Sequence, residues 1–150
     1  MSRLLIVHHS PSPNLERILD AVLAGASDES IEEVEVNVQP ALEATIDDVL
    51  QADGYILGTS ANIGYISGAL KHFFDTTFDV ASRETRMRPF SYFVHGRSDT
   101  SGAERAMESI TTGLGWRKVA EPLCFLGPPD RHHLDVAREL GATVAANLMS

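Results

Sequence analysis

The sequence predicts a one-domain α/β protein, in which helices cover both faces of a doubly wound, five-stranded parallel sheet. Stretches of strand length and of helix length alternate five times along the 150 residues. The connections are short, and no repeat, low-complexity segment or long linker divides the chain into further domains. Such alternation is typical of parallel sheets with right-handed crossovers. Of the common doubly wound strand orders, 2-1-3-4-5 suits five strands.

The first half of the chain begins with a continuous apolar strand at residues 4–7, as expected when both faces of a parallel sheet are covered. A helix follows, which Ser12 can cap with Pro13 at its first position. Its apolar residues recur at helical spacing: Leu15, Ile18, Leu19 and Val22. Valines alternate with polar residues at 34–38, which indicates an edge strand, and a short helix at about 45–51 follows.

The second half continues the alternation. The third strand, at residues 55–58, ends in a loop at 59–65. The next helix has these apolar positions: Ile66, Leu70, Phe73, Phe74 and Phe78. The fourth and fifth strands are expected at 91–95 and 119–126, and Ser101 with Glu104 forms a capping box for the helix between them. Trp116 is expected in the core, and the final helix has these apolar positions: Leu134, Ala137, Leu140, Val144 and Leu148.

Composition excludes several classes of protein. Hydrophobic content of 43% and charged content of 22% are typical of a globular chain. The net charge of −9 argues against a nucleic-acid binder, which needs a basic surface. No apolar run reaches membrane-spanning length, and a first strand at residue 4 leaves no room for a signal peptide. With Cys124 as the one cysteine, no intramolecular disulfide can form, so we expect a cytoplasmic protein.

Three loops follow the carboxyl ends of strands one, three and four, where doubly wound sheets hold ligands. In the first, the hydroxyls of Ser10 and Ser12 precede a helix N-terminus, which suits a phosphate monoester. The alternative is that Ser12 only caps the helix. In the loop at 59–65, small residues let a flat molecule approach the backbone. The alternative there is an ordinary strand–turn–helix unit in which Gly64 and Gly68 only loosen the turn.

One run resembles the segment after the third strand in NADPH-dependent FMN reductases and related flavodoxin-like proteins. It reads Gly64-x-Ile66-x-Gly68-x-Leu70-Lys71-x-x-x-Asp75. The resemblance implies that this loop wraps the isoalloxazine ring of FMN. The first loop is similar to the flavodoxin phosphate loop, Ser/Thr-x-Ser/Thr-Gly-x-Thr. Ser10 and Ser12 match its first two hydroxyl positions, whereas Pro13 replaces the glycine and Leu15 the last threonine.

The resemblance also implies that the loop after the fourth strand holds the pyrimidine edge of the flavin. Arg97 would lie near N1 and O2, where negative charge collects on reduction, or else in solvent at a polar turn. The cofactor-binding residues implied by the three loops are Ser10, Ser12, Pro13, Asn14, Leu15, Ser60, Ala61, Asn62, Ile63, Gly64, Tyr65, His95, Gly96, Arg97 and Asp99.

The activity implied by this resemblance is hydride transfer from NAD(P)H to bound FMN, followed by reduction of a quinone, flavin or similar small acceptor. No side chain is expected to act as acid or base, because the cofactor carries the chemistry. Two alternatives stay open. One is a flavodoxin-type electron carrier that does not use NAD(P)H. The other is a flavodoxin-like module that has lost FMN, suggested by Pro13 and Leu15.

Partners and metals are a separate question. Tyr65 is the one aromatic residue assigned to the candidate loops, so a second subunit is expected to complete the site in a homodimer or larger oligomer. The histidine pairs at 8–9 and 132–133 match no metal-binding spacing, and no metal is expected. A basic cluster of Arg83, Arg86 and Arg88 follows the third helix, either as a subunit contact or as a solvated turn.

Overall fold

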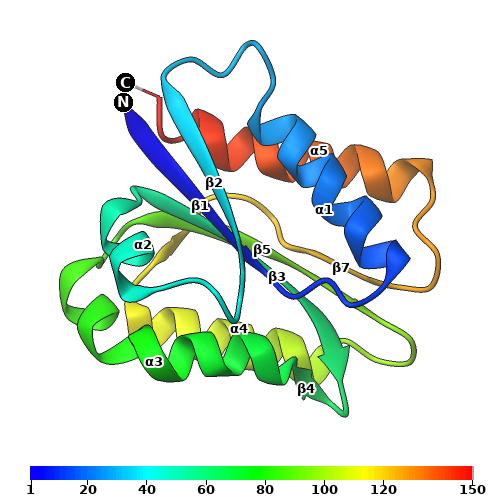
Figure 1. Ribbon diagram of the computed structural model, residues 1–150. Helices are drawn as coiled ribbons and strands as arrows, with labels where there is room; N and C mark the ends of the chain where they lie inside the picture. The colour runs from blue at the N-terminus through cyan, green and yellow to red at the C-terminus, as the bar shows by residue number, and fades with distance from the viewer. Residues whose placement is uncertain (150) are drawn as a thin grey trace.

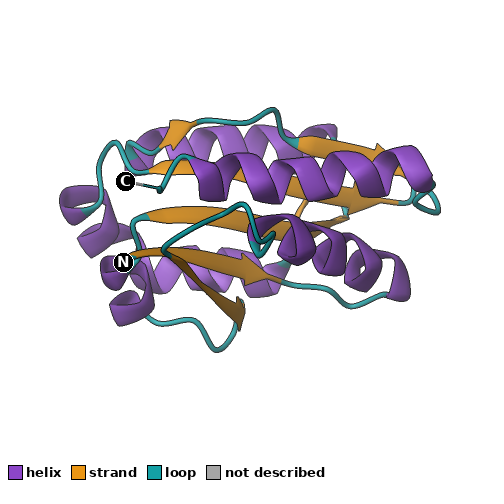
Figure 2. Cartoon of the chain, turned by 90° about the horizontal axis from the view of Figure 1, so that it is seen from above, coloured by secondary structure: helices purple, strands orange, loops and turns teal. Residues whose placement is uncertain are grey.

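The computed structural model describes residues 1–149, which form three layers, with helices on both sides of a parallel sheet (Figure 1). The strands are β1 (Ser2–His8), β2 (Val34–Pro40), β3 (Gly54–Asn62), β4 (Tyr65–Ile66), β5 (Pro89–Gly96), β6 (Arg117–Lys118) and β7 (Leu123–Leu126). The helices are α1 (Pro13–Ala26), α2 (Ile46–Gln51), α3 (Gly68–Glu84), α4 (Ser101–Leu114) and α5 (Arg131–Ala146). Helices α1 and α5 lie on one face of the sheet and α2, α3 and α4 on the other, as Figure 2 shows from the α1–α5 side.

The strand order confirms the predicted doubly wound sheet. It runs β2-β1-β3-β5, with β6 and β7 both pairing with the free edge of β5. Strand β1 is buried on both faces: Leu4 and Ile6 contact the α1–α5 side, and Leu5 and Val7 contact the other. Strand β2 pairs with β1 alone, which agrees with its predicted place at an edge. No helix in residues 1–149 has both the length and the apolarity that crossing a bilayer requires.

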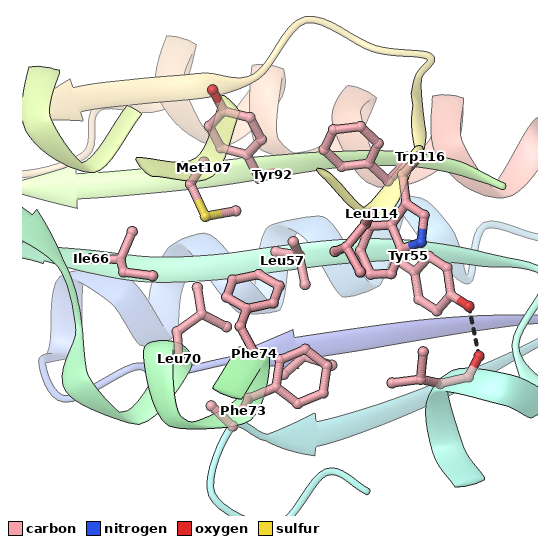
Figure 3. Close-up of a cluster of buried hydrophobic side chains, with 14 of the residues drawn as sticks. Tyr55, Leu57, Ile66, Leu70, Phe73, Phe74, Tyr92, Met107, Leu114 and Trp116 are labelled. Carbon is pink, nitrogen blue, oxygen red and sulfur yellow. Dashed lines mark hydrogen bonds between the residues drawn. The ribbon is translucent and has the colours of Figure 1, made fainter. Parts of the chain in front are cut away.

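The larger core lies between the sheet and helices α2, α3 and α4 (Figure 3). Phe73 and Phe74 of α3 are buried there, as predicted. Trp116 is also buried, and its ring stacks on Tyr55 with centroids 4.0 Å apart. The Tyr55 hydroxyl donates a hydrogen bond of 2.6 Å to the carbonyl of Val49 at the end of α2. This contact ties the short helix α2 to the central strand.

Two predictions for the loop at residues 59–65, after the third strand, are wrong. Strand β3 extends to Asn62 and pairs with β4, so residues 59–66 form a β-hairpin rather than a loop, and Ile66 lies in β4 rather than in the helix. The two turn residues, Ile63 and Gly64, both have positive φ, 48° and 75°. That pairing matches a two-residue type I′ turn, whose twist fits a hairpin. Helix α3 then begins after Ser67, whose side chain caps it.

The predicted capping box at Ser101 is also wrong. The N-cap of α4 is Thr100, and its hydroxyl donates to the Glu104 carboxylate at 2.7 Å instead of capping the backbone. Both the amide and the hydroxyl of Ser101 bond the side chain of Asp99, at 2.9 and 2.8 Å. An aspartate that bonds a backbone N–H two residues on makes a turn of its own, which here shifts the start of the helix.

The predicted fifth strand at 119–126 is interrupted. The structure has β6 before it and β7 at its end, with residues 119–122 outside any strand. The Ser91 hydroxyl donates to the Ala120 carbonyl at 2.9 Å, and Pro122 has no N–H for a sheet hydrogen bond. The contact of Ser91 and the missing N–H of Pro122 thus interrupt the pairing with β5, although the apolar pattern alone predicted one continuous strand.

Candidate functional site

A groove opens at the carboxyl ends of β1, β3 and β5, where the three loops that follow these strands meet. Its inner part has a volume of about 580 Å³ and is lined by Pro11, Ser12, Pro13, Asn14, Leu15, Ser60, Ala61, Asn62, His95, Gly96, Arg97 and Gly127. Its outer part, about 620 Å³, is lined by Ala61, Asn62, Ile63, Gly64, Arg97, Ser98 and Asp99. Because three lining residues are common to both parts, we describe them together as the loop groove.

The loop groove contains every residue predicted for the site except Ser10 and Tyr65. The Ser10 hydroxyl lies 3.0 Å from Nδ1 of His8, and Ser10 is not among the lining residues. Tyr65 is 41% exposed on β4, outside the groove. Gly127 was missed. The signal available in the sequence was a glycine followed by two prolines directly after the last strand. The structure gives Gly127 a φ of 79°.

The start of α1 forms one end of the loop groove. The amide N–H groups of Ser10, Ser12 and Asn14 donate no hydrogen bond to another residue within 1–149. The Leu15 N–H is taken by the Ser12 side chain at 3.2 Å, so the predicted cap is confirmed. Pro13 occupies the first helical position and has no N–H. Free N–H groups at a helix N-terminus form a site suited to an anion.

Leu15 explains one departure from the flavodoxin phosphate loop. Its side chain is 1% exposed and packs in the core between the sheet and the α1–α5 layer. The hydroxyl that a threonine would offer to the groove is replaced by apolar packing beneath it.

Ser60 has a buried hydroxyl with no partner, the only such buried side-chain N or O atom among residues 1–149. Its neighbour Thr59 differs: the Thr59 hydroxyl donates to the Ser60 carbonyl at 2.9 Å and accepts the Ser67 N–H at 3.0 Å. An unsatisfied buried hydroxyl costs about 1–3 kcal/mol. Ser60 lines the inner groove, so a polar ligand atom placed there would satisfy it.

His95 lies beside Ser60 in the floor of the inner groove. The two residues are direct neighbours in the β3–β5 ladder, and Phe125 of β7 is the neighbour on the other side. Nε2 of His95 lies 2.6 Å from the Gly127 carbonyl. Since a carbonyl can only accept, Nε2 carries the proton. The imidazole meets the ring of Phe125 edge-on, with centroids 5.1 Å apart.

The outer wall depends on close approach between the hairpin and α4. A Cβ placed on Gly102 would lie 1.9 Å from the Gly64 carbonyl oxygen, so the β3–β4 turn rests directly on the first turn of α4. A Cβ on Gly96 would lie 3.1 Å from the Cβ of Ala61. The Ser101 backbone N–H, followed by its hydroxyl, lowers the pKa of the Asp99 carboxyl on the rim. The outer groove thus lies between the β3–β4 hairpin and the loop after β5.

The charges and rings around the loop groove limit its chemistry. Its inner part is lined by His95 and Arg97 and by no carboxylate. No phenylalanine, tyrosine or tryptophan lines either part. Cys124 lies elsewhere, and burial, followed by the nearby Glu104, raises the pKa of its thiol to about 12. A protonated thiol is a poor nucleophile at neutral pH. Within residues 1–149, no group of three or more His, Cys, Asp or Glu side chains is placed to hold a metal ion.

The fold and the groove together define a flavodoxin-like α/β protein with a ligand site at the carboxyl ends of its strands. A flavodoxin from the domain Archaea superposes with a TM-score of 0.84 at 18% identity, over 97% of this chain and 98% of that one. Residues 22–127 match the family of NADPH-dependent FMN reductases. The chain belongs to this family, and the match together with the fold supports an FMN-binding oxidoreductase.

Two further relatives match parts of the chain. A flavodoxin of Aquifex aeolicus is 36% identical over 75 residues, which cover 50% of this chain and 40% of that protein. An NAD(P)H dehydrogenase (quinone) of Acidithiobacillus ferrooxidans is 29% identical over 136 residues, covering 76% of this chain and 66% of that protein. The chain therefore spans less than two thirds of the length of either relative.

Proposed function

We propose that the loop groove binds FMN, with the phosphate at the start of α1. The observation that carries this proposal is the unpartnered hydroxyl of Ser60, which is buried in the same inner groove as the free N–H groups of Ser12 and Asn14. A phosphate monoester offers three acceptor oxygens, enough to satisfy these donors together. The Ser10 hydroxyl bonds His8, and Ser10 is not a lining residue, so we do not assign it a phosphate contact here.

The flat ring system fits the outer groove. Its walls are the hairpin at residues 61–64 and the loop at residues 96–99, and the close contact of Gly102 with Gly64 keeps the hairpin in place. Once bound, FMN would supply the redox chemistry by accepting and passing on electrons. The chain's own part is to bind the phosphate, hold the ring edge between backbone walls and present Arg97 beside it.

We further propose that NAD(P)H is the electron donor and that a quinone, a flavin or a similar small molecule is the acceptor. The family description and the quinone-reducing relative favour this assignment. The groove supports it because no phenylalanine, tyrosine or tryptophan within residues 1–149 lines it, which leaves room for a nicotinamide. We also propose a homodimer or larger oligomer, in which a second subunit supplies the missing wall. The rival function is a flavodoxin-type electron carrier, favoured by the 36% identity to a flavodoxin.

The Ser60→Ala variant tests the site. We expect its affinity for FMN to fall about tenfold or more, because a hydrogen bond to a charged group contributes about 1.5–3 kcal/mol. Affinity for riboflavin, which lacks the phosphate, should hardly change. The apo variant should be at least as stable as the parent, because the lost hydroxyl was buried without a partner. Titration calorimetry and urea unfolding measure both effects.

Ser82→Ala, at a half-buried position of α3 outside the loop groove, is the matched control and should bind both flavins normally. Equal weakening of FMN and riboflavin by Ser60→Ala would place the phosphate elsewhere. Absence of any flavin binding by the parent protein would favour a module without cofactor.

Anaerobic stopped-flow spectroscopy of the FMN-loaded protein tests the electron donor. With excess NADH or NADPH we expect full loss of the oxidised flavin absorbance, because an uncovered ring lets a nicotinamide stack at hydride-transfer distance. A flavin that dithionite reduces but neither nucleotide does would identify an electron carrier instead.

A further inference from the structure

His95 occupies the position in the groove floor from which a side chain can reach the same ligand atoms as Ser60. The two residues are paired in the β3–β5 ladder, and both side chains lie on the α1–α5 side of the sheet. The start of α1, with Ser12 and Asn14, closes the inner groove above them. In the proposed FMN complex the phosphate would therefore lie within reach of the imidazole.

The orientation of this imidazole leaves one nitrogen free. Nε2–H is bound to the Gly127 carbonyl at 2.6 Å. The ring edge contacts Phe125, whose other neighbour is His133, stacked on it with centroids 3.8 Å apart. Nδ1 makes no hydrogen bond within residues 1–149. It is also not fully buried, because Ser60 Oγ is the one fully buried side-chain N or O atom there without a partner. Nδ1 is therefore open to the inner groove, which His95 lines.

Among residues 1–149, no carboxylate lines the inner groove beside His95. The other charged lining residue of the inner groove is Arg97, which is also basic. Asp99 lines only the outer part, where it bonds Ser101. Asp130, at the start of α5, pairs with His133 on the far side of Phe125. An imidazolium at position 95 would thus lack a counter-ion until an anion enters.

The remaining neighbours also supply no negative charge to His95 in the empty protein. His8 of β1 is partly buried, its Nδ1 bonds the Ser10 hydroxyl, and burial followed by the charge of His9 lowers its pKa. Glu16, in the first turn of α1, is exposed and is not a lining residue. The N-terminus of α1 adds about half a positive charge near the groove. A bound dianion would supply the negative charge that the inner groove lacks.

We propose that His95 takes up a proton when a phosphate monoester binds and that its Nδ1–H then donates to a phosphate oxygen. The inference rests on the proposed function. It assigns to His95 the donor that Pro13 and Leu15 cannot supply at the start of α1. At about pH 7.5 a phosphate monoester is mostly dianionic, because its second pKa is near 6. The proton therefore comes from solvent, Nδ1 gains it, and binding consumes up to one proton per FMN.

Titration calorimetry in two buffers of different ionisation enthalpy measures this proton directly. For the parent protein at about pH 7.5 we expect net proton uptake with FMN and none with riboflavin. Its FMN affinity should fall by up to about tenfold per pH unit between about pH 7 and 8.5, the slope for one coupled proton. In the His95→Gln variant the uptake should vanish, and at about pH 7 FMN should bind about tenfold or more weakly while riboflavin binds normally.

His132→Gln, an exposed substitution on α5, is the matched control and should keep the proton uptake. FMN binding without uptake by the parent protein, or uptake that persists in His95→Gln, would overturn the inference while leaving FMN binding intact. Failure of the parent protein to bind either flavin would overturn the proposed function as well. If His95→Gln does not fold, His95→Asn takes its place in the same comparison.

Discussion

Gly141→Ala should lower the free energy of unfolding by about 3 kcal/mol, within the range for inserting a methyl group where there is no space. A Cβ at position 141 of α5 would lie 2.0 Å from the Val22 carbonyl oxygen of α1. At the same crossing, a Cβ on Gly25 would lie 1.8 Å from the Arg138 carbonyl oxygen. Both obstacles are backbone atoms, so the two helices, which cross in Figure 1, would have to separate. Helix propensity alone favours alanine by about 1 kcal/mol, and the clash outweighs it.

Urea unfolding followed by circular dichroism measures this loss. Gly68→Ala is the matched control, because a Cβ there meets nothing within 4 Å and its φ is not positive. It should leave stability unchanged or raise it slightly. The Gly25→Ala and Gly141→Ala variants combined should cost less than the sum of the two, since the first methyl group already moves the helices apart. A Gly141→Ala loss below about 1 kcal/mol would mean that the crossing is not close-packed.

Arg88→Met should cost about 3 kcal/mol, because a buried acceptor left without its charged donor loses about 1.5–3 kcal/mol and several acceptors are involved here. Nη1 of Arg88 donates to the carbonyls of Leu50 and Ala52 at 3.0 and 2.7 Å and to the Tyr55 hydroxyl at 3.2 Å. The carbonyls of a last helical turn have no partner within the helix, and Arg88 supplies one for α2. The side chain of Arg88 is therefore held against α2, and the alternative of a solvated turn does not describe it.

Arg83→Met is the matched control for Arg88→Met. Arg83 belongs to the same basic cluster, is exposed in the last turn of α3 and makes no side-chain hydrogen bond within residues 1–149. Its substitution should change the urea midpoint very little. Equal losses in the two variants would show that the net charge of the cluster, rather than the contacts of Arg88, stabilises the protein.

The candidate site was predictable in outline because strand order places loops. Once strands one, three and four were recognised as neighbours, the loops after them had to meet at one end of the sheet. Which residues of those loops face the groove without a partner could not be predicted from the sequence. Thr59 and Ser60 are both hydroxyl residues at the end of the same strand, yet Thr59 is satisfied and Ser60 is not. Successive strand residues face opposite sides, and only the packed structure shows that one side offers the Ser67 N–H and the other an open groove.

The sequence by itself determined the alternation of strands and helices, the buried central strand, the Ser12–Pro13 start of α1 and the family resemblance. Each depends on residues within a few positions of one another, where periodicity and capping act. Tertiary structure decided the β3–β4 hairpin, the interrupted last strand, the contacts of Arg88 and the place of His95 beside Gly127. The contacts named for these features join residues from 3 to 38 positions apart. These contacts form because packing brings polar groups without a partner close to one another, and the local sequence pattern does not show which groups these are.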